Sequence, residues 1–275
     1  MKSLKISRSL GGIFLSLLVS VTWAENKTLP WPEKIHAAVS LSYDDAVPVH
    51  YQKVAPLLEQ YGLRGTFYLT IKLVNQFAPW KQVADNKHEL GNHALFHPCR
   101  QVPKESYEWL EDHYDLSTYS LDRFRDELHT ANKFLDLLDG GKPRTYGNNC
   151  THLTVGSGEH ETPMDPVLEE LFTAARGTQT NQIITAGNLN YTRLGHCSAD
   201  DKTFSQVKAE IEQARREGGW IIYMIHGVGK GTHPLFMDEE EHQKLIAWLA
   251  EEKDSIWTAP VVDVANFLKS KNVGK

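Results

Sequence analysis

Residues 37–46, AAVSLSYDDA, form an apolar run that ends in two adjacent carboxylates, Asp44 and Asp45. The first five residues of this segment predict a buried β-strand. In parallel α/β proteins the side chains that carry chemistry lie at the carboxyl ends of strands. Two adjacent carboxylates there repel each other unless a cation or a proton relieves the repulsion. The pair therefore indicates a cation site or, as the simpler alternative, the N-cap of a following helix.

Short apolar runs and longer amphipathic segments continue to alternate along the chain. They predict further strands at residues 65–69, 145–146, 220–225 and 255–258, and helices at residues 49–61, 121–138, 203–217, 238–251 and 260–270. Such alternation over about 250 residues favours a parallel sheet or barrel. No linker rich in proline, glycine or serine divides the pattern, so we expect one domain over residues 25–275. Residues 98–120, rich in aromatic and charged side chains, predict a long functional loop.

The first 24 residues are expected to be a secretory signal peptide. Lys2, Lys5 and Arg8 precede an apolar run at residues 10–21, and Ala24 offers a small residue at the cleavage point. The run is short for a membrane span, which needs about 20 residues, although an uncleaved anchor is the alternative. We therefore expect a protein exported to the periplasm or secreted, with no stable membrane insertion after cleavage.

Charge and cysteine content restrict the partners and the redox chemistry. The net charge is −6, and removing the three cationic residues of the leader gives −6 − 3 = −9, which argues against nucleic acid as a partner. Cys99, Cys150 and Cys197 lack the paired spacing of a structural zinc site. Two of these cysteines can form one disulfide, but the sequence does not indicate which two. The alternative is three buried thiols. The oligomeric state is not predicted.

Three histidines stand where chemistry is expected. His93 and His97 lie in GNHALFHP, residues 91–98, and can bring two imidazoles onto one ion. The spacing alone is weak, because the chain has 13 histidines. His226 follows the apolar run at residues 220–225, a place that suits a general acid or base. The alternative for each is an ordinary structural histidine.

Together these segments resemble the polysaccharide deacetylase, or NodB-homology, family of carbohydrate esterases. SYDDA at residues 42–46 is similar to the family motif T-F-D-D-G. The H-x-x-x-H of residues 93–97 is similar to H-S/T-x-x-H, and YMIH at residues 223–226 resembles L-x-I-H. The similarity extends over residues 36–268 and includes YQKVAPLLEQYGLRGTFYLT at residues 51–70. The order of the motifs makes the resemblance specific.

The resemblance implies a distorted (β/α)7–8 barrel and a metal-dependent deacetylase. One divalent ion, zinc first and cobalt or nickel as alternatives, would be held by Asp45, His93 and His97. Asp44 would be the base that deprotonates a water molecule, and His226 the acid that protonates the leaving group. The substrate would be an acetylated carbohydrate, either an N-acetyl amino sugar or, as the alternative, an O-acetyl ester of the acetylxylan type.

Other parts of the implied site match the family less closely. In PRTYGN, residues 143–148, a backbone N–H near Tyr146 would stabilise the oxyanion, and Arg144 would orient Asp44. Trp257 is a candidate for stacking on a sugar face, although core packing is the interpretation that we favour for it. Ala46 replaces a family glycine, so we expect a somewhat different turn there. The candidates for the partner of His226 are Asp200, Asp201 and Asp263.

Two further functions fit the residue types. Two histidines and a carboxylate also form the metal site of non-haem Fe(II) oxygenases, but those proteins use an all-β fold and an H-x-D motif. A non-catalytic sugar-binding relative is the other alternative, and it is disfavoured because the five polar residues of the main motifs are all present.

Overall fold

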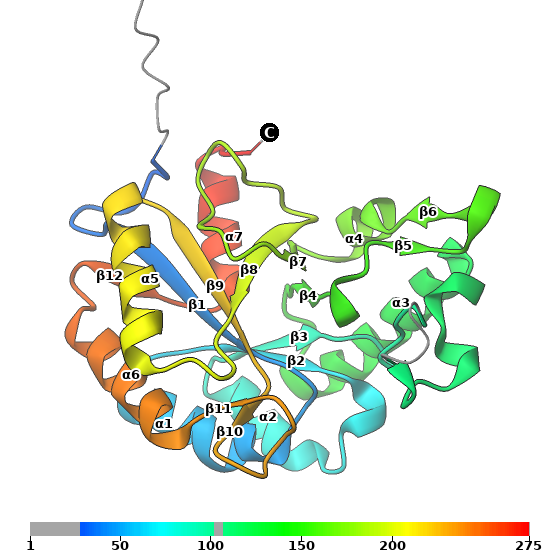
Figure 1. Ribbon diagram of the computed structural model, residues 1–275, viewed down its shortest axis with the longest axis horizontal. Coiled ribbons are helices and arrows are strands. Elements are labelled where there is room, and N and C mark those ends of the chain that lie inside the picture. Colours follow the sequence, from blue (N-terminus) through cyan, green and yellow to red (C-terminus); the bar gives the residue numbers. More distant parts are fainter. Residues whose placement is uncertain (1–27, 102–106, 275) are drawn as a thin grey trace, which may run out of the picture.

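A computed structural model describes residues 28–101 and 107–274 (Figure 1). The predicted signal peptide lies outside the described residues. The main sheet is parallel, with the strand order β12-β1-β2-β3-β4-β7-β8-β9, and an additional pairing of β1 with β9 closes it into a barrel. The strands of this sheet are β1 (Ala37–Tyr43), β2 (Thr66–Leu69), β3 (Glu89–Asn92), β4 (Tyr146–Gly147), β7 (Ala175–Gln179), β8 (Leu194–Ser198), β9 (Trp220–Ile225) and β12 (Ile256–Thr258).

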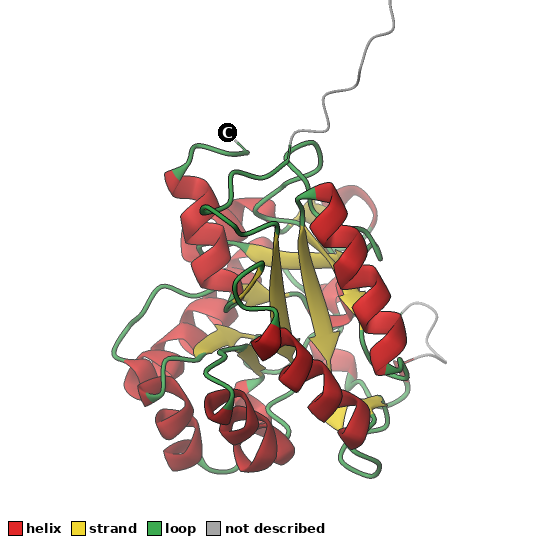
Figure 2. Ribbon diagram, turned by 90° about the vertical axis from the view of Figure 1, so that its left-hand side faces the viewer, coloured by secondary structure: helices red, strands yellow, loops and turns green. Residues whose placement is uncertain are grey.

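Helices surround the strands on the outside of the barrel (Figure 2). The α-helices are α1 (Ala55–Gln60), α2 (Phe77–Asp85), α3 (Leu121–Asp139), α4 (Asp165–Leu171), α5 (Phe204–Glu217), α6 (Glu239–Glu251) and α7 (Val261–Ser270). Two small ribbons, β5 (Thr154–Val155) with β6 (Thr162–Pro163) and β10 (Gly227–Val228) with β11 (Phe236–Met237), lie in the loops. The predicted distorted (β/α) barrel is confirmed.

Strand β1 is where the barrel is distorted. One of its edges pairs with β9 over six residues, from Ala38 opposite Trp220 to Tyr43 opposite Ile225. The other edge is shared, because β12 pairs with the first part of β1 and β2 pairs only with its last two residues. The register between β1 and β9 brings the residues that follow the two strands, Asp44 and His226, to the same end of the barrel.

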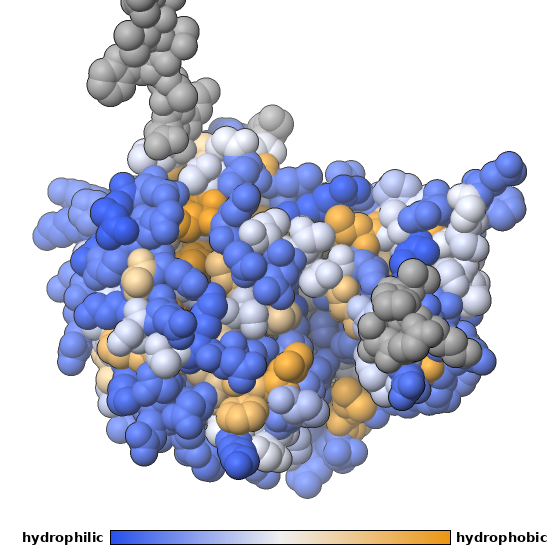
Figure 3. Space-filling model, in the orientation of Figure 1, coloured by the Kyte–Doolittle hydropathy of each residue, from blue (hydrophilic) through white to orange (hydrophobic). Residues whose placement is uncertain are grey.

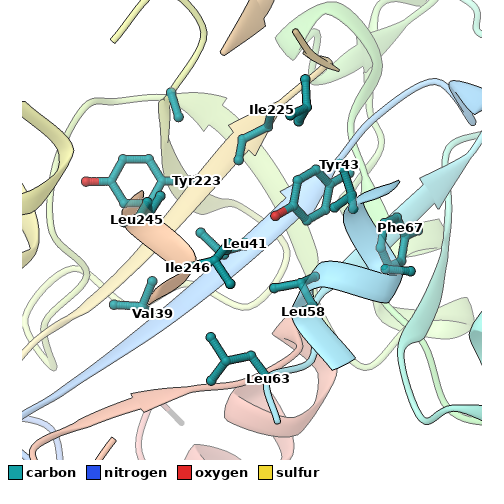
Figure 4. Close-up of a cluster of buried hydrophobic side chains, with 14 of the residues drawn as sticks. Val39, Leu41, Tyr43, Leu58, Leu63, Phe67, Tyr223, Ile225, Leu245 and Ile246 are labelled. Atoms are coloured by element: carbon teal, nitrogen blue, oxygen red, sulfur yellow. The ribbon is translucent and has the colours of Figure 1, made fainter. Parts of the chain in front are cut away.

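A hydrophobic core fills the space between β1, β2 and β9 and the helices packed on them (Figure 4). Leu41 and Tyr43 of β1, Phe67 of β2 and Ile225 of β9 are completely buried, as is Leu245 of α6. Burial of one such side chain contributes about 1.5–3 kcal/mol relative to its exposure. This apolar packing fixes the strand ends that carry the polar residues of the site.

The strands that the sequence did not reveal are the polar ones. Strands β3, with the sequence ELGN, β7, with ARGTQ, and β8, with LGHCS, have no run of apolar residues. Strands β7 and β8 show the reason. Their buried polar side chains, Arg176 and His196, lie inside the protein. Hydrophobic periodicity therefore misses these strands, whereas β9, which is nearly all apolar, was predicted with the residues that the structure shows.

Among the described residues, no helix combines the length and the apolar character that a membrane crossing requires. The face shown in Figure 3 is largely hydrophilic, with separate apolar patches.

Candidate metal centre and active site

The candidate site lies at the carboxyl ends of the barrel strands, beside a cavity of about 820 Å³. Asp44 and Asp45 follow β1, His93 follows β3 and His226 follows β9. All four line the cavity together with His97. The predicted site residues from three distant segments of the sequence are therefore brought together.

Asp45, His93 and His97 surround one point. Their ligand atoms lie within 4.8 Å of one another. The Nε2 atoms of His93 and His97 are 3.4 and 3.3 Å from Oδ1 of Asp45. That oxygen is buried and has no hydrogen-bond partner among the described residues. A buried carboxylate oxygen without a partner is unfavourable, and one carboxylate with two imidazoles suits a divalent ion such as zinc. The residues therefore fit a metal.

A hydrogen bond to the main chain prepares His93 for such a role. Its Nδ1 lies 2.6 Å from the carbonyl oxygen of Gly147, which can only accept, so Nδ1 carries the proton. The lone pair of the neutral ring is then on Nε2, which faces Asp45. Histidines that bind metals are commonly held in this way by a carbonyl group on the second nitrogen.

Asp44 lies beside this group but forms an ion pair with a different residue, Arg176. The Arg176 guanidinium donates to both carboxylate oxygens of Asp44, with Nη1 2.8 Å from Oδ1, and both residues are buried. Burial alone would raise the pKa of Asp44, but the charge of Arg176 and its hydrogen bonds outweigh burial and lower it. Asp44 is thus an anion at neutral pH, and Oδ2 is 3.8 Å from Nε2 of His93.

The prediction that Arg144 orients Asp44 is wrong. Arg144 donates instead to the carboxylate of Asp139, with both Nη2 contacts at 2.9 Å, and to the main chain of Asn132. It precedes β4 and so lies toward the amino end of that strand, away from the site. Arg176 of β7 has the role instead, and its strand left no apolar pattern in the sequence.

Asp200 is the partner of His226 among the three candidates. Its Oδ2 lies 2.6 Å from Nδ1 of His226, and its Oδ1 accepts from the backbone N–H of the same residue at 3.0 Å. Burial alone would lower the pKa of His226. The hydrogen bond to Asp200 and the charges of Asp44 and Asp45 outweigh burial and raise it. The contact with Asp200 therefore favours the protonated form of His226.

Comparison with known proteins agrees with this geometry. The polysaccharide deacetylase family model matches residues 33–150, a span that contains Asp44, Asp45, His93 and His97. The resemblance to the polysaccharide deacetylases is confirmed. A gellan lyase of Bacillus sp. is 21% identical over an alignment of 273 positions, which covers 91% of this chain and 10% of that protein. The peptidoglycan-N-acetylmuramic acid deacetylase of Bacillus subtilis is 27% identical over 110 residues, 39% of this chain and 36% of that protein.

Two solved structures share this fold. A protein assigned to the polysaccharide deacetylases of Mycobacterium smegmatis has a TM-score of 0.60 at 15% identity, covering 90% of this chain and 95% of that one. A family 4 acetyl xylan esterase of Clostridium thermocellum, solved with a cobalt ion, has a TM-score of 0.50 at 16% identity, covering 84% and 91%. The chain spans only 10% and 36% of the length of the two curated relatives.

Several residues of this deacetylase-like site have unusual backbone conformations. The φ angles of Asp45, Ala46, Ala94 and His97 are 73°, 54°, 63° and 59°. Ala46 adopts a positive φ, the conformation that a glycine at this position would favour. Such conformations cost about 1–3 kcal/mol each and concentrate at functional sites, where the surrounding packing enforces them.

Two further predictions for the site concern Tyr146 and Trp257. The backbone N–H of Tyr146 donates to the carbonyl oxygen of Ala174 at 3.0 Å as part of the sheet, so it is not free for an oxyanion. Trp257, in β12, packs against Trp31 and Phe267, with ring centroids 6.4 and 5.4 Å apart. Its register with the first half of β1 places it far from the carboxyl ends of the strands. Core packing, the interpretation favoured for Trp257 from the sequence, is confirmed.

Two features near the site were not assigned from the sequence. His233 stacks on His226, with centroids 5.0 Å apart and planes 7° from parallel, and its Nε2 is 3.6 Å from Oδ2 of Asp45. Cys99 and Cys150 form a disulfide, while Cys197 is free and buried. The stacked histidine had no motif to identify it, and the pairing of the cysteines depends on distances that no sequence contains.

The hydrogen bond between Asp200 and His226 predicts a pH effect. In an Asp200→Asn variant the pKa of His226 should fall, because the carboxylate that raises it is gone. An activity that requires protonated His226 would then decline at a lower pH than in the wild type. Measurement of kcat/KM against pH tests this, with Asp201→Asn as the matched control. An alkaline limb that does not move would show that His226 is not the acid.

Proposed function

We propose that the protein is a metal-dependent hydrolase that removes acetyl groups from an acetylated carbohydrate. The observation that carries the proposal is the unpartnered Oδ1 of Asp45 between His93 and His97, with the separate carboxylate of Asp44 beside them. This arrangement supplies three ligands for an ion and, in Asp44, a separate carboxylate that can act as the base. Zinc is the ion that we expect first, with cobalt or nickel as substitutes.

A divalent ion bound there supplies Lewis acidity to a carbonyl group and lowers the pKa of a water molecule towards about 7. Asp44 accepts the proton of the attacking water, and Arg176 keeps its carboxylate ionised and correctly oriented. His226 donates a proton to the departing amine or alcohol, and Asp200 holds its ring through Nδ1. Nε2 of His226 is thereby left for the substrate.

Asn148 is our candidate for the donor that stabilises the oxyanion. It follows β4 directly, lines the cavity and is 4% exposed. Both polar atoms of its side-chain amide are buried without a hydrogen-bond partner among the described residues. A buried unpaired amide is costly unless a ligand completes it, and an amide N–H aimed at a developing negative charge is a common source of catalysis.

The cavity wall supports a carbohydrate as the substrate. Tyr107, Trp109 and Tyr114, from the long loop before α3, line it on the side of His97. Trp109 is 59% exposed, and its ring centroid is 5.5 Å from that of His97. An exposed aromatic face beside the reacting centre can cover the apolar face of a sugar ring. The acidic net charge of −6 also suits a neutral or cationic sugar better than an anionic polymer.

We further propose that residues 25–275 act as one catalytic domain outside the cytoplasm, after removal of the leader at residues 1–24. The Cys99–Cys150 disulfide supports this placement, because disulfides persist in oxidising compartments.

The test is a metal and substrate assay on the purified protein. We expect about one divalent ion per chain and release of acetate from N-acetylated amino-sugar oligomers. O-acetylated xylan serves as the second substrate, because an ester passes through the same tetrahedral oxyanion. Full activity after the metal has been removed by a chelator would overturn the mechanism. Release of acetate from the xylan alone would reassign the protein as an O-acetyl esterase.

A further inference from the structure

We propose that the Cys99–Cys150 disulfide positions the metal ligand His97, so that metal retention depends on the oxidised state of this pair. The inference rests on the proposed function, since it takes His97 as a ligand. It concerns a part of the site outside the strand-end motifs. The disulfide joins the loop after β3 to the loop after β4, across a separation of 51 residues, and both loops line the cavity.

The first argument is the hydrogen bond of His97. Its Nδ1 lies 3.6 Å from Sγ of Cys99. A disulfide sulfur has no hydrogen and can only accept a hydrogen bond. For this contact to be a hydrogen bond, Nδ1 of His97 must therefore carry the proton. The lone pair of the neutral ring is then on Nε2, the atom 3.3 Å from Oδ1 of Asp45. The sulfur thus does for His97 what the carbonyl of Gly147 does for His93.

The second argument is that after reduction of the disulfide the sulfur no longer fixes which ring nitrogen of His97 carries the proton. A phosphine reductant and one water convert the disulfide into two thiols, and the phosphine leaves as its oxide. Sγ of Cys99 then carries a hydrogen and can donate to Nδ1. The ring can therefore take the opposite tautomer, with the proton on Nε2, which cannot bind an ion. The oxidised pair excludes that hydrogen bond.

The third argument is the shape of the joined loops. His97 has a φ of 59°, and Cys150 and Thr151 have φ angles of 50° and 60°. Residues with side chains rarely adopt such angles, and the surrounding structure must enforce them. The covalent link holds these turns against each other. Arg100 also connects the two loops, through its contacts with His152 and Thr154. Loss of the disulfide should therefore change the loops locally and not separate them.

A variant that lacks both cysteines of the disulfide provides the test. The Cys99→Ala/Cys150→Ala variant removes the sulfur acceptor and the link without adding thiolate ligands. Cys197→Ala is the matched control, because that buried thiol is unpaired in β8. The measurement is the dissociation constant for Zn²⁺, from competition with a chromophoric chelator in non-reducing buffer. Thermal unfolding of the metal-free proteins shows whether each variant is folded at the temperature used.

We expect the double variant to bind Zn²⁺ about 10- to 100-fold more weakly than the wild type, the usual effect of losing a partner of a metal-binding histidine. The Cys197→Ala protein should bind as the wild type does. Wild-type protein that is reduced and freed of phosphine should also bind more weakly, and reoxidation should restore its affinity. A double variant with unchanged affinity overturns the inference and leaves the proposed function standing. An oxidised wild type that binds no ion overturns the proposed function itself.

Discussion

An Asp44→Asn variant should lose the proposed deacetylase activity by a factor of about 10²–10⁴, the usual contribution of a general base. It should still bind its metal ion, because Asp45, His93 and His97 remain. The structure adds a consequence that the motif alone does not show. Arg176 is completely buried against Asp44 and would be left without its counter-charge. The variant should therefore also be less stable.

The measurements are kcat, the metal content and the free energy of unfolding of the same preparation. The double variant Asp44→Asn/Arg176→Met separates the two effects, because it removes the stranded charge together with the base. We expect it to regain stability and to remain inactive. An Asp44→Asn protein with wild-type activity would exclude Asp44 as the base, and loss of the ion would place it among the ligands.

An Arg176→Met variant should be destabilised by about 3–5 kcal/mol, the cost of leaving one member of a buried ion pair unpaired. Because the pKa of Asp44 is lowered in the folded protein, the stabilisation from its charge is complete above the ordinary value of 3.8. It is lost as the pH falls through the lowered value. The difference in stability between wild type and variant should therefore narrow in acid.

Denaturant unfolding at neutral and acidic pH measures this difference, and Arg144→Met is the matched control. Arg144 is also a buried arginine paired with a buried aspartate, Asp139, but the pair lies outside the site. We expect the control to lose stability while its folded molecules keep their activity. An Arg176→Met protein whose folded molecules also keep their activity would mean that Arg176 acts only on stability.

The core of the candidate site was predictable because its residues directly follow recognisable segments. Asp44 and Asp45 come after an apolar strand, His226 comes after another, and His93 and His97 lie four residues apart. The strands β1 and β9 are apolar because they are buried, so their ends could be located by hydrophobicity alone. The family resemblance then supplied the roles, which local pattern could not.

The partners of these residues were not predictable in the same way. Arg176 lies in a strand with the sequence ARGTQ, which has no apolar run, and its buried side chain contacts the polar groups of Ser42 and Asp44. Arg144 was chosen in its place because it stood beside a recognisable motif. Asp200 was one of three candidates, and only the hydrogen bond to His226 separates it from the other two. Pairings of this kind depend on the register between strands that are far apart in the sequence.

The amino-acid sequence by itself determined the alternation of strands and helices and the residue types at the strand ends, because burial and periodicity act locally along the chain. The tertiary structure decided which charges face each other. It joined Arg176 to Asp44 and Asp200 to His226. It also selected Cys150 as the partner of Cys99, beside His97. The reason is physical: an ion pair, a tautomer or a disulfide depends on distances of a few ångströms, which exist only once the barrel has closed.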